Sequence, residues 1–245
     1  MKMMPLLLGC VFSLSAHAAT LVPGSANPWL AGMPDGSPAA FGDAAPAQSP
    51  ILVTEISISA GMALTFSATG SVGYGGGETY NPRGDTGNLA NTSFGFISHL
   101  ALLGLTGEEN GISNLNAPLS ALVGVFLDNS QPDGSAAPAM LDFGPGGNVT
   151  DGIDYLTISP LLKQVFYIGN GLTSDSLPQN VIVPIGATRL YLGTMDGFGW
   201  DGNTGEFSVT VSAVPEPETY TMLLAGLGLV AFAVRGTQSK GVDQR

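Results

Sequence analysis

The segment Glu206-Phe207-Ser208-Val209-Thr210-Val211 alternates polar and apolar side chains over six residues. In an extended backbone this spacing places Phe207, Val209 and Val211 on one face and the polar residues on the other. Asn203-Thr204-Gly205, a turn-forming triplet, precedes it. We therefore predict a β-strand here, with one buried face and one solvated face.

Similar short apolar segments recur through residues 51–213 and are separated by Gly, Pro and Asn. The chain has 35 Gly and 17 Pro in 245 residues, which favours many tight turns over long helices. We interpret residues 51–213 as one all-β domain, a β-sandwich. The other predicted strands are Ile51–Ile58, Ala63–Val72, Ala121–Leu127, Lys163–Ile168 and Thr188–Leu192.

Residues 19–50 are rich in Pro, Gly, Ala and Ser and contain consecutive turn signals around Trp29. We predict an irregular N-terminal arm that packs over the edge of the domain through this apolar residue.

The first 18 residues combine Met1-Lys2, an apolar run and the small-residue sequence Ala16-His17-Ala18. This pattern is typical of a secretory signal peptide that signal peptidase removes after Ala18. The alternative is a lipoprotein box, Leu7-Leu8-Gly9-Cys10, with Cys10 as the lipid acceptor. Cys10 is the only cysteine, so a chain processed after Ala18 has no disulfide and no thiolate site.

The C-terminal residues 214–245 contain Pro215-Glu216-Pro217, the apolar run 219–234 and then Arg235. Because the run shows no polar face, we expect a membrane-directed helix rather than an amphipathic helix of a soluble core. Sixteen residues are short for a full span, which usually needs about 20. The segment resembles the PEP-CTERM sorting tail of Gram-negative bacteria. That resemblance implies export, recognition by an exosortase, transient membrane anchoring and a final place at the cell surface or in the extracellular matrix.

The formal net charge is −12, and only Arg83, Lys163 and Arg189 are basic between the signal and the tail. Nucleic-acid binding needs clustered basic residues and is excluded. No catalytic motif stands out, so we expect no enzyme activity. His99 lacks a sequence-level partner, Glu108-Glu109 suggests a solvated loop, and Asp151–Asp154 is typical of a turn.

Two glycine-rich loops carry the candidate chemistry. The second loop places Asp196, Asp201 and Asn203 on one bend, and hard cations such as Ca²⁺ prefer such carboxylate and amide oxygens. Asp, Asn and Gly also form ordinary turns, so spacing alone leaves both interpretations open.

Both loops resemble the galactose-specific calcium lectins of bacteria, a family of small β-sandwiches, which implies a sandwich of the lectin or jelly-roll type for residues 51–213. The resemblance rests on Tyr74-Gly75, Tyr80-Asn81-Pro82, Gly84-Asp85 and Asn203-Thr204-Gly205-Glu206-Phe207-Ser208-Val209. It implies a calcium ion held by the Tyr74 carbonyl and by the side chains of Asp196 and Asn203. Gly202 stands where the lectins have a second asparagine, with Asp201 in a position to compensate. The sugar-contacting His and Gln of the lectins have no clear counterpart.

These observations together predict an exported or surface-attached, non-enzymatic, lectin-like protein that binds calcium and associates with extracellular polysaccharide. The sugar would meet the bound ion at Asp196 and the apolar faces of Tyr80 and Trp200. Two alternatives stay open: a structural matrix protein without a sugar ligand, and a polysaccharide-degrading enzyme.

Overall fold

The computed structural model describes residues 18–75, 77, 79–84, 95–215 and 225–230. Almost all of the predicted signal peptide and most of the sorting tail lie outside these residues. Within the predicted tail helix, residues 225–230 are helical, with the side chains of Leu227, Leu229 and Val230 exposed. Among the described residues, no helix has both the length and the apolar character needed to cross a bilayer.

The described chain is mainly β, which confirms the all-β class. Its strands are β1 Thr20–Pro23, β2 Ile51–Leu52, β3 Ala63–Gly73, β4 Thr79–Tyr80, β5 Phe96–Ser98, β6 Leu115–Pro118, β7 Leu122–Leu127, β8 Leu141–Asp142, β9 Thr157–Ile158, β10 Val165–Tyr167, β11 Asn180–Ile182, β12 Arg189–Thr194 and β13 Thr204–Ala213. Short 3₁₀ helices lie between them: η1 Pro28–Leu30, η2 Ala40–Gly42, η4 Ala101–Leu103, η5 Pro132–Gly134, η6 Gly152–Asp154 and η7 Trp200–Gly202.

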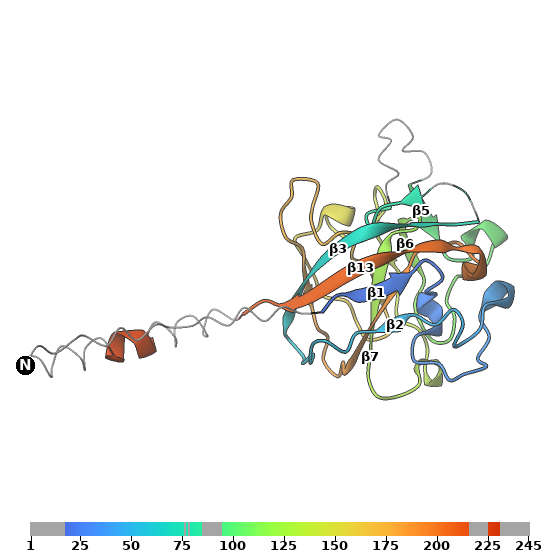
Figure 1. Cartoon of the computed structure of the whole chain (residues 1–245). Helices are drawn as coiled ribbons and strands as arrows, with labels where there is room; N and C mark the ends of the chain where they lie inside the picture. Colours follow the sequence, from blue (N-terminus) through green and yellow to red (C-terminus); the bar gives the residue numbers. More distant parts are fainter. Residues whose placement is uncertain (1–17, 76, 78, 85–94, 216–224, 231–245) are drawn as a thin grey trace, which may run out of the picture.

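The strands form three sheets. The largest has the order β1-β13-β3-β11-β9, with β4 also paired to β3; the second has the order β10-β7-β12-β2, and the third β5-β6-β8. β13 is antiparallel to β3 over ten residues, from Thr204 opposite Gly73 to Ala213 opposite Leu64. Its other edge pairs with β1 (Figure 1). The alternating segment that predicted a strand is thus an inner strand of the largest sheet.

One hydrophobic cluster takes side chains from the two larger sheets. In β13 the buried residues are Phe207, Val209 and Val211, as the alternation predicted, whereas all six residues of β7 are buried. Burial on both faces explains why β7 reads as a continuous apolar run. The finer assignment, a two-sheet sandwich, stays a prediction.

The prediction of a strand over Ile51–Ile58 is wrong beyond Leu52. The Val53 amide still donates to the Leu190 carbonyl at 2.9 Å, but the Thr54 amide turns to the Glu55 carboxylate at 3.0 Å. Bends at Glu55 and Ile56 then take the chain out of the ladder. Ile56 and Ile58 nevertheless pack against the core from an irregular segment.

The segment predicted to be an irregular arm is partly regular, because Thr20–Pro23 pairs with β13 as β1. Trp29 is fully buried rather than laid over an edge. Its indole Nε1 donates to the Ser113 carbonyl at 3.0 Å. Val22, Ala26, Trp29 and Ala31 of this segment thus belong to the main hydrophobic core.

Candidate functional site at the start of β13

The pairing of β3 with β13 places the two glycine-rich loops side by side. Gly73 lies opposite Thr204, so Tyr74 leaves the sheet where Asn203 enters it. Beyond the sheet the backbones stay close, because a Cβ built on Gly202 would lie 3.8 Å from the Gly75 Cα. Residues that are more than 120 positions apart in the sequence therefore share one edge of the molecule.

Asp196 follows β12 and is 6% exposed. Its Oδ1 accepts the Gly197 and Phe198 amides, and its Oδ2 accepts Asn203 Nδ2 at 2.8 Å. Burial raises the pKa of Asp196 above its ordinary value, and these hydrogen bonds offset part of that effect. The carboxylate is thus desolvated without a basic partner.

The Asn203 side chain joins this carboxylate to the N-terminal arm. Its Nδ2 also donates to the Gly24 carbonyl at 3.2 Å, while its Oδ1 is buried without a hydrogen-bond partner in the described structure. If the Asn203 amide were rotated by half a turn, Oδ1 would take the place of Nδ2 and would face the Asp196 carboxylate and the Gly24 carbonyl. These three oxygen atoms would repel one another unless a cation lay among them. A cation bound here would therefore need the Asn203 amide in the rotated orientation.

Asp43 is the residue that sequence reasoning missed. Its carboxylate is 1% exposed and accepts Asn27 Nδ2 at 3.0 Å, the Trp200 amide at 2.9 Å and the Asp201 amide at 3.2 Å. It ties the arm to the first turn of η7. A carboxylate there also suits the positive end of a helical turn. No local motif marks Asp43, since its partners lie 16 to 158 positions away.

The remaining predicted site residues fall into two groups. Trp200 is fully buried, and its Nε1 donates to the Thr194 carbonyl at 3.0 Å, so its ring offers no face to a sugar. Tyr80 is only 7% exposed. Tyr74 and Asp201 are exposed. Of the two aromatic residues in this loop, the sequence reasoning selected Trp200, which is buried, whereas Phe198 is 39% exposed.

His99 lies beside this cluster rather than alone. Its ring stacks on Trp29 at 3.9 Å between centroids and meets Trp200 edge-on at 5.4 Å. Nδ1 lies 3.1 Å from the Gly197 carbonyl, and Nε2 lies 3.0 Å from Glu109 Oε2. Glu109 is therefore not part of a solvated loop, as expected from the sequence, but a partner of a buried histidine.

Within the described residues, no three His, Cys, Asp or Glu side chains gather into a metal-binding group. The predicted cation would therefore depend on the Asn203 amide and on backbone carbonyls beside Asp196. The turn at Asp151–Asp154 has a structural role, because Asp154 pairs with Arg83 at 3.2 Å and accepts the Ser174 amide at 2.7 Å.

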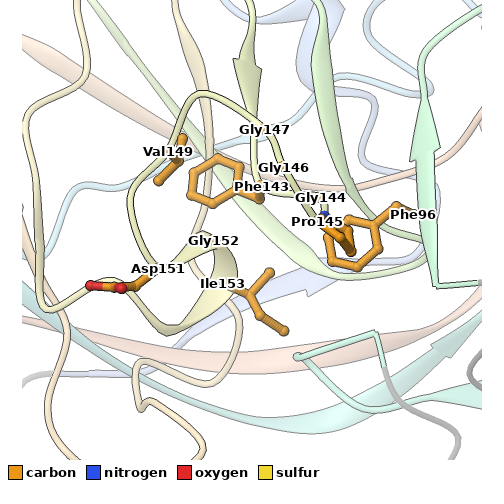
Figure 2. A pocket seen from close by; sticks show the side chains of 10 residues that line it. All are labelled: Phe96, Phe143, Gly144, Pro145, Gly146, Gly147, Val149, Asp151, Gly152 and Ile153. Carbon is orange, nitrogen blue, oxygen red and sulfur yellow. The ribbon is translucent and has the colours of Figure 1, made fainter.

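A separate pocket of about 360 Å³ lies between β5 and the turn after β8. Phe96, Phe143, Val149 and Ile153 supply its apolar walls, and Gly144–Gly147 form its rim. Asp151 is its one charged lining residue, and the carboxylate is turned away from the aromatic rings (Figure 2). Because no polar side chains converge in it, this pocket is a weaker candidate for chemistry than the group formed by Asp196, Asn203 and the Gly24 carbonyl, which we call the Asp196 cluster.

Comparison with known proteins identifies the tail. The model of the PEP-CTERM protein-sorting motif matches residues 213–236, beginning at the last residue of β13. Proteins with this motif are exported, sorted to the cell surface and processed by an exosortase. No curated protein matches the chain. The motif covers none of the residues that carry the lectin resemblance.

Proposed function

We propose that this exosortase-sorted surface protein is a non-enzymatic, lectin-like matrix component that binds calcium at the Asp196 cluster and associates with extracellular polysaccharide. The observation that carries the proposal is the Asn203 amide, whose nitrogen lies between the Asp196 carboxylate and the Gly24 carbonyl. An amide donor takes the position that a cation would need, and its own oxygen is buried without a partner.

Asp196, Asn203 Oδ1 and the carbonyls of Gly24 and Tyr74 are the groups that would hold the ion. Calcium accepts six to eight oxygens in flexible geometry, so amides and carbonyls serve beside a single carboxylate. The exposed Asp201 can add an oxygen from the solvent side. A bound cation would supply positive charge to the desolvated carboxylate and free coordination positions for sugar hydroxyls.

Calcium is expected to stabilise the exported protein. Binding only the folded state at a hundredfold excess over Kd adds about 2.7 kcal/mol, which corresponds to a Tm rise of roughly 5–10 °C for a domain of this size. Asp196→Asn should abolish the rise. In chelator its Tm should change little, because removal of the buried charge offsets the cost of turning an NH₂ group toward Asn203 Nδ2. Differential scanning calorimetry with calcium or chelator measures both quantities.

Asp133→Asn is the matched control, since Asp133 is exposed and bonds only its near neighbour Gln131.

A pH series adds a second check. Because the pKa of Asp196 is raised in the folded state, burial of its charge destabilises the protein fully at pH values above that pKa. Protonation relieves this destabilisation as the pH falls toward the pKa of the unfolded state. In chelator, wild type should therefore gain stability relative to Asp196→Asn as pH is lowered from 7 to 4. Equal Tm values for wild type with calcium and with chelator would contradict the proposed cation site.

Processing at both ends is expected in the secreted material. The mature chain should lack residues 1–18 and end near Pro217, because the sorting motif begins where β13 ends and removing it leaves the strand intact. Intact mass spectrometry of protein from the medium and from an exosortase-deficient strain tests this. Secreted protein that still carries residues 219–234 would contradict exosortase processing.

A matrix protein without a sugar ligand is the second candidate. The burial of Trp200 and Tyr80 favours it, because those rings were the predicted sugar contacts. Binding of neutral oligosaccharides with and without calcium separates the two candidates.

A further inference from the structure

An exposed pair of aromatic side chains lies next to the Asp196 cluster, since the Phe198 amide points to the Asp196 carboxylate. Phe41 is 54% exposed and Phe198 is 39% exposed, and their ring centroids lie 4.9 Å apart at 44°. Phe41 comes from the N-terminal arm and Phe198 from the loop after β12, so the pair exists only in the folded chain. We call these two rings the Phe41–Phe198 platform.

The backbone at Phe41 is in the left-handed region, with φ 65° and ψ 20°. A bulky residue rarely adopts this conformation, which costs free energy that the surrounding structure must supply. This strained conformation buries little apolar surface in the core, because more than half of the Phe41 surface stays in solvent. A conformation that is unfavourable locally and exposes an aromatic ring is better explained by binding than by folding.

Hydrogen bonds hold the platform on both sides. The Ala40 amide donates to Glu109 Oε1 at 2.6 Å, and the Ala39 amide donates to the Asp43 carbonyl at 2.7 Å. The Phe198 amide points to the buried Asp196 carboxylate at 3.4 Å. Because Asp43 also binds the Trp200 and Asp201 amides, arm and loop are fixed relative to each other. The two rings are therefore positioned before any ligand arrives, which lowers the entropic cost of binding.

Charge decides which ligand fits. The exposed acidic residues Asp201 and Glu206 flank the loop, and Asp201 Oδ1 lies 3.8 Å from a Cβ built on Gly199, next to Phe198. The three basic residues of the domain bind elsewhere: Arg83 to Asp154, Lys163 to Ser135 and Arg189 to the Asp128 carbonyl. An anionic polymer would be repelled. A neutral sugar ring offers C–H groups to the aromatic faces and hydroxyl donors to a carboxylate.

We propose that the Phe41–Phe198 platform stacks a neutral pyranose unit of the surface polysaccharide, with Asp201 accepting a sugar hydroxyl. The proposal rests on the polysaccharide association in the proposed function and names the residues that carry it. It replaces Trp200 and Tyr80, which are buried, with two rings that are open to solvent.

The test uses the processed, exported protein and a panel of neutral glucan and galactan oligosaccharides beside uronic-acid oligosaccharides, measured by isothermal titration. Phe41→Gly should weaken binding of a neutral ligand about tenfold, from the lost ring contact. Its Tm should stay equal or rise, because glycine adopts φ 65° without strain. Phe198→Ala should weaken binding similarly, and Phe198→Tyr should restore it.

Ile185→Ala is the matched control, since Ile185 is 88% exposed and lies before β12, at the end opposite Phe198. Its affinity should equal that of wild type. Wild-type binding that Phe41→Gly and Phe198→Ala leave unchanged would overturn the platform but not the proposed function. Absence of any saccharide binding by wild type would overturn both. A change in oligomeric state in place of saccharide affinity would show that the rings bind a second copy, and would also overturn the platform.

Discussion

Asp43→Ala is expected to lower the free energy of unfolding by about 3–5 kcal/mol, because it leaves three donors around one buried position without their acceptor. The donors are Asn27 Nδ2 and the amides of Trp200 and Asp201. Leaving a buried donor unsatisfied costs about 1–3 kcal/mol, which makes this residue more costly to lose than a surface carboxylate. Urea unfolding followed by tryptophan fluorescence measures the change, since Trp29 and Trp200 are both buried.

Asp43→Asn gives the intermediate case. It keeps one acceptor oxygen but turns an NH₂ group toward the remaining donors, so a loss of about 1–2 kcal/mol is expected. Asp133→Ala should stay within about 0.5 kcal/mol of wild type, as an exposed substitution. If the free energy of unfolding of Asp43→Ala lies within about 1 kcal/mol of the wild-type value, the carboxylate does not join arm and loop as described.

His99→Ala is the second substitution with a large expected effect, a loss of about 3 kcal/mol or more. The ring is 1% exposed and packs against both Trp29 and Trp200, whose own ring centroids lie 5.5 Å apart. Truncation leaves a cavity and removes the partner of both the Gly197 carbonyl and the Glu109 carboxylate. Chemical denaturation, with the near-ultraviolet circular dichroism of the two tryptophans, reports the loss of stability and the loosened packing.

Glu109→Gln is the companion variant, because it preserves the shape and one hydrogen-bonding oxygen. It should retain most of the stability and the near-ultraviolet signal. A His99→Ala protein with an unaltered tryptophan spectrum would argue against the stacked arrangement. If Glu109→Gln loses as much stability as His99→Ala, the charge of the pair contributes more to stability than the packing of the His99 ring.

The parts of the fold that sequence predicts are those whose periodicity is long enough to identify. β13 and β3 alternate over several residues, and β7 is buried on both faces, so each leaves a distinct pattern. β1 has four residues and β2, β4, β8 and β9 have two each, too few for any period to appear. Their positions follow from partners far along the chain, which a single sequence does not reveal.

The candidate site likewise has one part that the sequence predicts and one part that it does not. Asp196, Asp201 and Asn203 lie within eight residues and were predicted together because one bend carries them. Asp43 joins them from the N-terminal arm through backbone amides, which no residue type identifies in advance. Trp200 and Phe198 are two positions apart, and only the fold determines which of the two faces the core and which faces solvent.

The position of β13 between the sorting motif and the candidate site has a mechanical consequence. If the tail is held in the membrane and the Phe41–Phe198 platform binds a polymer as proposed, tension would enter β13 at Ala213 and pass along it toward Thr204. The strand is pulled along its own axis between β1 and β3, so the ladder bonds over its ten-residue length are loaded in shear together rather than opened one at a time. The protein would then act as a tether, in which the hydrogen bonds of Asp43 between arm and loop share the load with β13.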